Sequence, residues 1–277
     1  MALVMKGTSR QSLAMSRALM DSSLASMNGE QASTLAADLF LITRTLDSSK
    51  SLLRALTDPS REAQGKAGVA QALFGQHVGA NAANLLEELV KARWSRSSDL
   101  ANATEQLAVE AESAAANADG TLDALEAELF QFGRVVAGNS DLRAALVARN
   151  LGTSEQKGEL VRSLLAGKVA PATLRLIVQL VMHPRGRHIE GGLNDFAQAA
   201  ADRRNRMIAH VKSAIELTSA QQERLSAALT AELGRPMRVN VEVDKSVVGG
   251  LSIRFADELI DGTTVSRLAE ASRRLAG

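Results

Sequence analysis

The sequence predicts a mainly α protein, in which two related N-terminal helical bundles precede a small C-terminal α/β domain. Three observations predict this. The first 206 residues are rich in Ala and Leu and hold three of the four prolines, which is a helical composition. The same region repeats itself along the chain, and beyond it apolar and polar residues alternate as they do in strands. The predicted domains are residues 1–105, 106–206 and 207–277.

Helices in the first bundle are predicted by the spacing of apolar residues. Leu35, Leu39, Ile42 and Leu46 recur at steps of three and four, so they share one face of a helix. Such a face needs a partner to cover it, which predicts a bundle.

The second bundle is predicted by an internal repeat. Leu53-Arg54-Ala55-Leu56 reappears within residues 142–146 with one added residue, and Gly29 corresponds to Gly120. Seven further pairs share an offset of 91 residues: Lys66/Lys157, Leu73/Leu164, Leu85/Leu176, Leu86/Ile177, Leu89/Leu180, Val90/Val181 and Arg96/Arg187. Chance can match leucines in so Leu-rich a chain, but charge, glycine and order recur here as well. We therefore interpret the repeat as a duplicated bundle.

The C-terminal domain is predicted to be α/β. Residues 239–243 and 251–255 each alternate apolar and polar side chains, which is typical of half-buried strands. Between residue 211 and these strands, Thr218 or Ser219 is placed to cap a helix that runs to Leu233. A last helix is expected after Asp261-Gly262-Thr263.

Composition excludes several classes of protein. The net charge is +1, and there is one Trp and no Tyr, so nucleic acid is not an expected partner. The chain has no cysteine, which removes disulfides and thiolate sites. No stretch reaches the roughly 18 to 20 apolar residues of a membrane-spanning helix. The basic, Ser-containing N-terminus weakly resembles a transit peptide, but an ordinary first helix is the preferred interpretation.

No catalytic, cofactor-binding or metal-binding residues are expected. His183 and His188 are close in sequence, but Pro184 and Gly186 break the helix that a metal pair would need. Gly249-Gly250 could bring the backbone near an anionic ligand, although a tight turn into a strand is the more probable interpretation. The basic cluster over residues 203–212 either meets an acidic partner or offsets a helix dipole.

The last third resembles the delta subunit of F-type ATP synthase, the bacterial relative of the oligomycin-sensitivity-conferring protein. The resemblance rests on an ordered series of short motifs: Val211-Lys212-Ser213-Ala214, Leu217-Thr218, the Val239–Val243 strand, Asp244 with Gly249-Gly250, Asp261-Gly262-Thr263 and Arg267-Leu268. Residues 129–196 also resemble the helical domain of that family. Lys245, Thr263 and Phe255-Ala256 depart from the usual residues at their positions. Residues 1–105 are additional to the common length of family members, and longer actinobacterial members have such an extension.

The resemblance implies a non-catalytic subunit of the peripheral stalk, without a cofactor. It implies that the helical domain binds the alpha subunits of the catalytic head and that the C-terminal domain binds the b subunit. Membrane association is then expected only through the complex, at the cytoplasmic face of the bacterial plasma membrane. Asp244, Gly249, Gly250, Asp261 and Gly262 are expected to form structural turns.

Five residues are candidates for a groove that holds a partner helix: Leu107, Val109, Leu176, Leu180 and Val181. Core packing is the alternative for each. A free-standing helical-repeat adaptor is the alternative function, and an enzyme that uses Gly249-Gly250 for an anionic ligand is a third. Deletion of residues 1–105 is expected to leave a folded fragment of family length.

Overall fold

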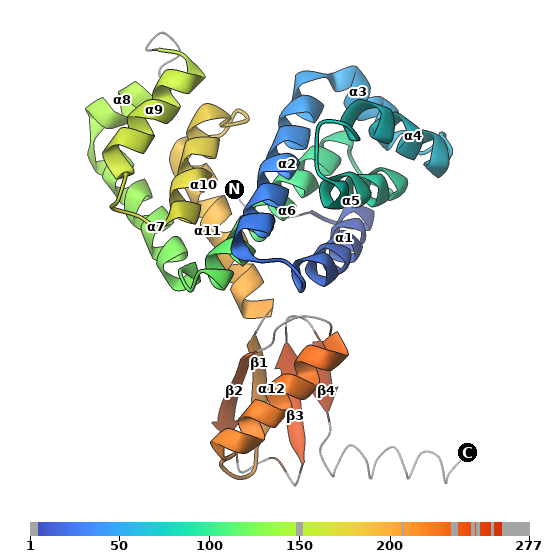
Figure 1. Ribbon diagram of the computed structural model, residues 1–277, viewed down its shortest axis with the longest axis vertical. Coiled ribbons are helices and arrows are strands. Elements are labelled where there is room, and N and C mark those ends of the chain that lie inside the picture. Colours follow the sequence, from blue (N-terminus) through green and yellow to red (C-terminus); the bar gives the residue numbers. More distant parts are fainter. Residues whose placement is uncertain are drawn as a thin grey trace. The chain divides into compact units, whose positions relative to one another are not determined.

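The computed structural model describes residues 5–147, 152–206, 208–233, 238–244, 247, 250–255 and 258–261. Over these residues the chain forms twelve helices and one four-stranded sheet (Figure 1). It divides into two compact units, Met1–Ala201 and Asp202–Gly277, which we call the helical unit and the C-terminal unit. The predicted fold class, mainly α with a small C-terminal α/β part, is confirmed.

Eleven helices begin within the described part of the helical unit. They are α1 (Thr8–Leu24), α2 (Gly29–Ser48), α3 (Lys50–Thr57), α4 (Ala63–Phe74), α5 (Ala80–Lys91), α6 (Ser97–Ala118), α7 (Leu122–Gly138), α8 (Ser140–Val147), α9 (Ser154–Leu165), α10 (Pro171–Met182) and α11 (Ile189–Arg206).

Local sequence explains where several of these helices begin. At α2, the Asn28 side chain accepts the Gln31 backbone N–H and the Gln31 side chain accepts the Asn28 N–H, which is a capping box. Thr153 and Gln156 make the same pair of bonds at α9. The first residue of α10 is Pro171, whose missing N–H costs nothing at that position.

The helix bounds repeat with the offset found in the sequence. Adding 91 to the bounds of α4 (63–74) and α5 (80–91) gives 154–165 and 171–182, which are the bounds of α9 and α10. The same shift carries α1 onto α6 and α6 onto α11. The helices therefore form two sets of six, α1–α6 and α6–α11, and α6 belongs to both.

Helix α6 lies at the centre of the helical unit. It contacts α1, α2, α3, α5, α7 and α10, and 14 of its 22 residues are buried, so it has almost no solvent face. Many of these residues are Ala, which lets neighbouring helices approach closely on several sides. The helix spans residues 105 and 106, where the sequence predicts the boundary between the two bundles. That division stays a prediction.

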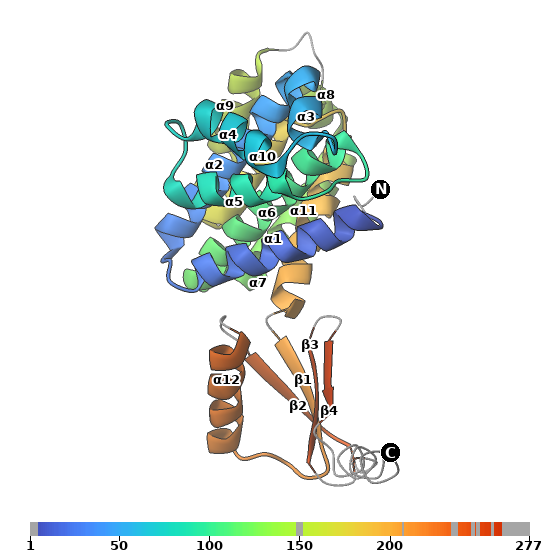
Figure 2. The same cartoon turned by 90° about the vertical axis from the view of Figure 1, so that its right-hand side faces the viewer.

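The C-terminal unit contains β1 (Ile208–Ser213), α12 (Ser219–Leu233), β2 (Arg238–Val243), β3 (Leu251–Phe255) and β4 (Glu258–Asp261). The strand order is β2-β1-β3-β4; β1 and β2 are parallel, and the other two pairings are antiparallel. Helix α12 makes the crossover between the parallel strands and covers one face of the sheet (Figure 2). The expected last helix lies outside the described residues.

The core of the C-terminal unit joins this helix to the sheet. Ala209, Val211, Leu229 and Ile253 are buried together. Thr218 and Gln221 form a capping box at α12, so the predicted start of this helix is confirmed. Within the described residues, no helix combines the length and apolar character needed to span a membrane.

Candidate partner-binding surfaces

The five residues proposed for a partner groove lie in the interior of the helical unit. Leu107 and Val109 are on α6, and Leu176, Leu180 and Val181 are on α10; their exposed fractions are 0–3%. Burial in the interior is what the alternative interpretation, core packing, predicts for these residues. A partner helix would reach these side chains only after a neighbouring helix moved away.

Helices α2 and α7 are the neighbours that contact both α6 and α10. Glu112 of α6 joins α2, α6 and α10, because it accepts hydrogen bonds from Ser33 of α2 (3.1 Å) and from Arg175 of α10 (2.7 Å). The Glu112 residue is 2% exposed, and burial raises the pKa of its carboxyl group against the opposing effects of Arg175 and Ser33. Farther along α2, Arg44 donates to the side-chain carbonyl of Gln179 on α10 (3.2 Å).

A cluster of charges around the buried Glu105 fixes the loop between α10 and α11 to α2 and α6. Arg185 forms ion pairs with Asp47 of α2 and with Glu105 of α6, the latter at 2.6 Å. Arg187 contacts the other oxygen of Glu105 at 2.5 Å and lies over the ring of Phe196, 5.6 Å from its centroid. Arg185 also donates to the side-chain oxygen of Asn102 (3.1 Å), and these three contacts hold its left-handed backbone conformation, with a φ of 52°.

A pocket of about 540 Å³ opens beside this charge cluster. Arg44, Gln179 and His183 line it together with Arg185 and its acidic partners. Burial, and then the positive charge of Arg44, lowers the pKa of His183, so this imidazole is neutral near pH 7. The charges around the pocket are mostly engaged with each other, which makes it a polar junction between the helix sets.

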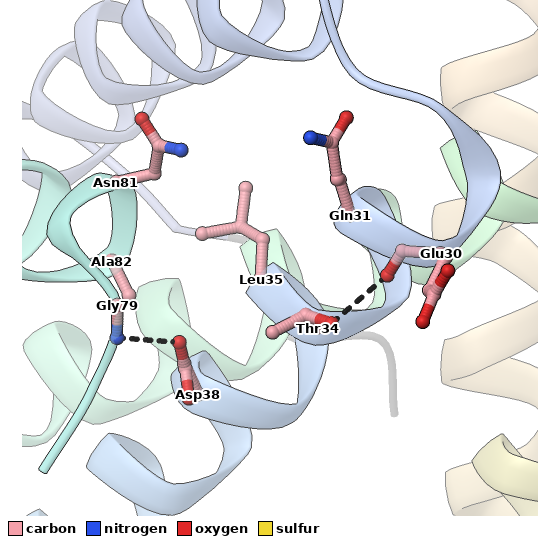
Figure 3. Close-up of a pocket in the computed structure, with 8 residues that line it drawn as sticks. All are labelled: Glu30, Gln31, Thr34, Leu35, Asp38, Gly79, Asn81 and Ala82. Atoms are coloured by element: carbon pink, nitrogen blue, oxygen red, sulfur yellow. Dashed lines mark hydrogen bonds between the residues drawn. The ribbon is translucent and has the colours of Figure 1, made fainter.

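A second pocket, of about 240 Å³, lies between the N-terminal ends of α2 and α5 (Figure 3). Asp38 of α2 accepts the backbone N–H of Gly79, the N-cap of α5, at 2.8 Å. In the second helix set Glu128 of α7 accepts the N–H of Ala170, the N-cap of α10, at 3.0 Å. Both helix sets therefore use an acidic side chain from a neighbouring helix as a cap, which is favourable next to a helix N-terminus.

The predicted turn residues join strands of the C-terminal unit. The Asp244 carboxylate accepts from the Lys212 ammonium (3.0 Å), and its backbone N–H donates to the Ser213 carbonyl (2.8 Å), so the end of β2 is held against β1. Gly250 precedes β3 with a φ of 78°, a conformation that favours glycine. Asp261 pairs with a residue of β3 at the end of β4. Gly249 and Gly262 lie outside the described residues.

Among the described residues, the remaining sequence candidates include no group of metal ligands. In the part of the chain that the structure describes, no three His, Asp or Glu side chains gather in a way that could hold a metal ion. Arg203, in the basic cluster, is buried at 7% exposure and is thus not placed to meet a partner.

Comparison with known proteins identifies the family. Residues 109–275 match the ATP synthase delta (OSCP) subunit family. An ATP synthase subunit delta from Streptomyces griseus is 46% identical over 99% of this chain and 100% of its own length. The subunits delta from Thermobifida fusca and Streptomyces coelicolor are each 44% identical, over 99% and 98% of this chain and 100% and 98% of their own. The chain belongs to the ATP synthase delta (OSCP) subunit family.

Membership in the delta family confirms the resemblance found in the motifs of the last third. The match to the family begins at residue 109, within α6, and covers the second helix set and the C-terminal unit. The relatives nevertheless match over their full length, so helices α1–α5 are a shared part of these longer delta subunits.

Several interaction residues were not found from the sequence. Asp38 and Glu128 are acidic residues at corresponding places in the repeat. This correspondence could have predicted that both cap a neighbouring helix. Arg185 and Glu105 gave no comparable signal, because the contact joins a loop residue to a helix residue 80 positions away in the sequence.

Proposed function

We propose that the chain is the non-catalytic connector of the peripheral stalk of an F-type ATP synthase. In this role it links the alpha/beta catalytic head to the membrane-anchored b subunit, so that rotation drives proton-coupled ATP synthesis. The observation that carries the proposal is the full-length correspondence with delta subunits, at 46% identity over 99% of the chain.

The helical unit is proposed to hold the alpha subunits, and the C-terminal unit the b subunit. Met15 and Leu19 on α1 support such a role for the helical unit, because large apolar side chains at 75% and 40% exposure suit an amphipathic partner helix. Binding of this kind needs neither a cofactor nor a titrating group. The chain would then associate peripherally with the cytoplasmic face of the plasma membrane, through the complex.

The test is purification of the synthase from cells that carry a tagged head subunit. We expect the chain to co-purify with the head and the b subunit, and the isolated chain to hydrolyse no ATP. Removing the chain should leave ATP hydrolysis by the head but abolish its coupling to proton pumping. Absence of the chain from the purified synthase would overturn the proposal, and a pull-down dominated by proteins outside the synthase would favour the adaptor alternative.

A further inference from the structure

Helices α2 and α7 occupy corresponding places in the two helix sets, and their inner faces match residue by residue. The buried residues of α2 and α7 are related by an offset of 90: Leu35/Leu125, Leu39/Leu129, Ile42/Phe132 and Leu46/Val136. All eight are 5% exposed or less. This register aligns the two helices unambiguously, so the side chains on their outer faces can be compared as well.

The outer faces carry the same two anchor residues. Phe40 of α2 corresponds to Phe130 of α7, and Arg44 corresponds to Arg134, by the same offset of 90. In each helix the aromatic ring and the guanidinium are four residues apart, so they lie on one face. We call Phe130, Gln131, Arg134 and Val135 the α7 outer face.

Only the copy on α2 is covered. Phe40 is 5% exposed, because its ring packs against Phe196 of α11 with centroids 6.3 Å apart. Arg44 is half-buried and donates to the amide oxygen of Gln179 on α10. The chain thus shows what covers this face: two helices that present an aromatic ring and an amide acceptor.

On α7 the same face is open. Phe130 is 58% exposed and Val135 is 49% exposed. Together with Gln131 and Arg134 they line a depression of about 520 Å³. Arg134 is exposed, and among the described residues no ion pair or hydrogen bond engages its guanidinium. Helix α7 also contacts α6, α8 and α10, but these contacts leave Phe130 and Val135 exposed.

We propose that the α7 outer face binds a helix of another subunit of the same complex. The structure of the covered copy defines the chemistry of this helix: an aromatic or aliphatic side chain packs on Phe130 and Val135, and an amide or carboxylate one turn away accepts from Arg134. This inference rests on the proposed function for the presence of the partner, but the face and its chemistry come from the repeat.

A second copy of the same chain does not fit this face. The surface that would have to cover it is the one formed by Phe196 and Gln179, and α2 of the same chain already occupies that surface. A contact of this head-to-tail kind would also build rings or filaments of the chain.

The test places a photo-crosslinking benzoylphenylalanine at position 130 of the full chain in the purified synthase. The control position is Leu73 on α4, because it and its repeat equivalent Leu164 are exposed to similar degrees, 45% and 38%. We expect position 130 to crosslink to one helical segment of another subunit. That segment should carry an apolar side chain three or four residues from Gln, Asn, Asp or Glu.

Two substitutions then measure the contribution of the face. Phe130→Ala and Arg134→Glu should each weaken retention of the chain by the complex about tenfold or more, with an unchanged melting temperature of the isolated chain. A Lys at the acceptor position of the partner should restore retention of R134E. Leu73→Ala should change neither quantity, and Phe40→Ala should lower the melting temperature.

Each contrary outcome has its own meaning. Crosslinks from position 130 to lipid, to a second copy or at no more than the level of position 73 would overturn the proposed face, as would full retention of both variants. If the unmodified chain were itself absent from the complex, the proposed function would fail and this inference with it.

Discussion

Glu105 is the residue on which the junction of the two helix sets depends. It is 4% exposed, and its two carboxylate oxygens accept hydrogen bonds from two arginines of the loop between α10 and α11. A charge buried to this degree is tolerated only when it is paired and hydrogen-bonded. The pairing is therefore a strict constraint on how α10 and α11 sit against α6.

Replacing Glu105 by Gln is expected to lower the free energy of unfolding by about 3 kcal/mol, because Arg185 and Arg187 each lose one acidic partner and keep only Asp47 and Asp195, respectively. Urea denaturation followed by circular dichroism measures this. The control is Glu159→Gln, which removes an exposed pair with Arg162 and should cost less than about 0.5 kcal/mol. Equal losses in the two variants would contradict the role of this charge cluster.

His183 gives the helical unit a dependence on pH. Its pKa in the folded protein is lowered, so the unfolded chain takes up a proton at this residue before the folded one does. Its contribution to stability is present above the ordinary His pKa of about 6.5 and is lost as the pH falls below it. We expect His183→Asn to flatten the decrease in melting temperature between about pH 7 and pH 5. His77→Asn, at an exposed position, should leave the wild-type profile unchanged; identical profiles for H183N and the wild type would contradict the assignment.

At the scale of elements, helix ends are fixed by side chains from other helices. Glu128 of α7 accepts from the Ala170 N–H and from the Thr173 hydroxyl, and so ties the start of α10 to α7. An N-cap usually satisfies the N–H groups of its own helix, whereas this contact satisfies the start of one helix with a side chain from another. The contact joins two elements at a helix start, where the first backbone N–H groups have no partner within the helix.

Glu128→Ala is expected to lower the free energy of unfolding by about 1 to 2 kcal/mol, through the lost cap and the orphaned donors of α10. Glu128→Gln keeps an acceptor oxygen and should cost less, so the pair separates the hydrogen bond from the charge. Thermal or urea unfolding measures both variants. A Gln variant that is less stable than the Ala variant would show that the cap is not what Glu128 supplies.

The elements could be predicted from the sequence to different degrees. The repeat, the helix ending at Leu233 and the strands near residues 239 and 251 followed from periodicity and capping signals. Strand β4 was missed because four residues are too few to show a period. The groove could not be located, since α6 is covered on nearly every side, and periodicity marks apolar positions without saying which helix covers them.

At the scale of the whole molecule, we expect a fragment to fold only if it keeps α6, the helix that both helix sets share. The sequence suggests removing residues 1–105, but that cut falls within α6 and discards Leu100 and Glu105, both of them buried. A cut before residue 97 keeps α6 complete. The second helix set would then retain its central helix, although the surface covered by α2 becomes exposed.

The fragment 97–277 is therefore expected to melt cooperatively and at a higher temperature than the fragment 106–277. Circular dichroism at 222 nm, with the full chain as reference, measures the difference. Both fragments should melt below the full chain, because Arg185 loses Asp47 in each. A fragment 106–277 as stable as 97–277 would mean that residues 97–105 of α6 belong to the first helix set alone.

The sharing of α6 also has a mechanical consequence. Tandem domains are usually joined by a loop, and a loop bends before the domains do. Here the two helix sets meet in one uninterrupted helix of 22 residues, whose axial hydrogen bonds run from one set into the other. A sideways load on one helix set is passed to the other through the continuous helix α6, and no flexible loop separates them at this point. In a stalk that must resist torque, the helical unit would then act as a stiff lever, and elastic deformation would be stored elsewhere in the assembly.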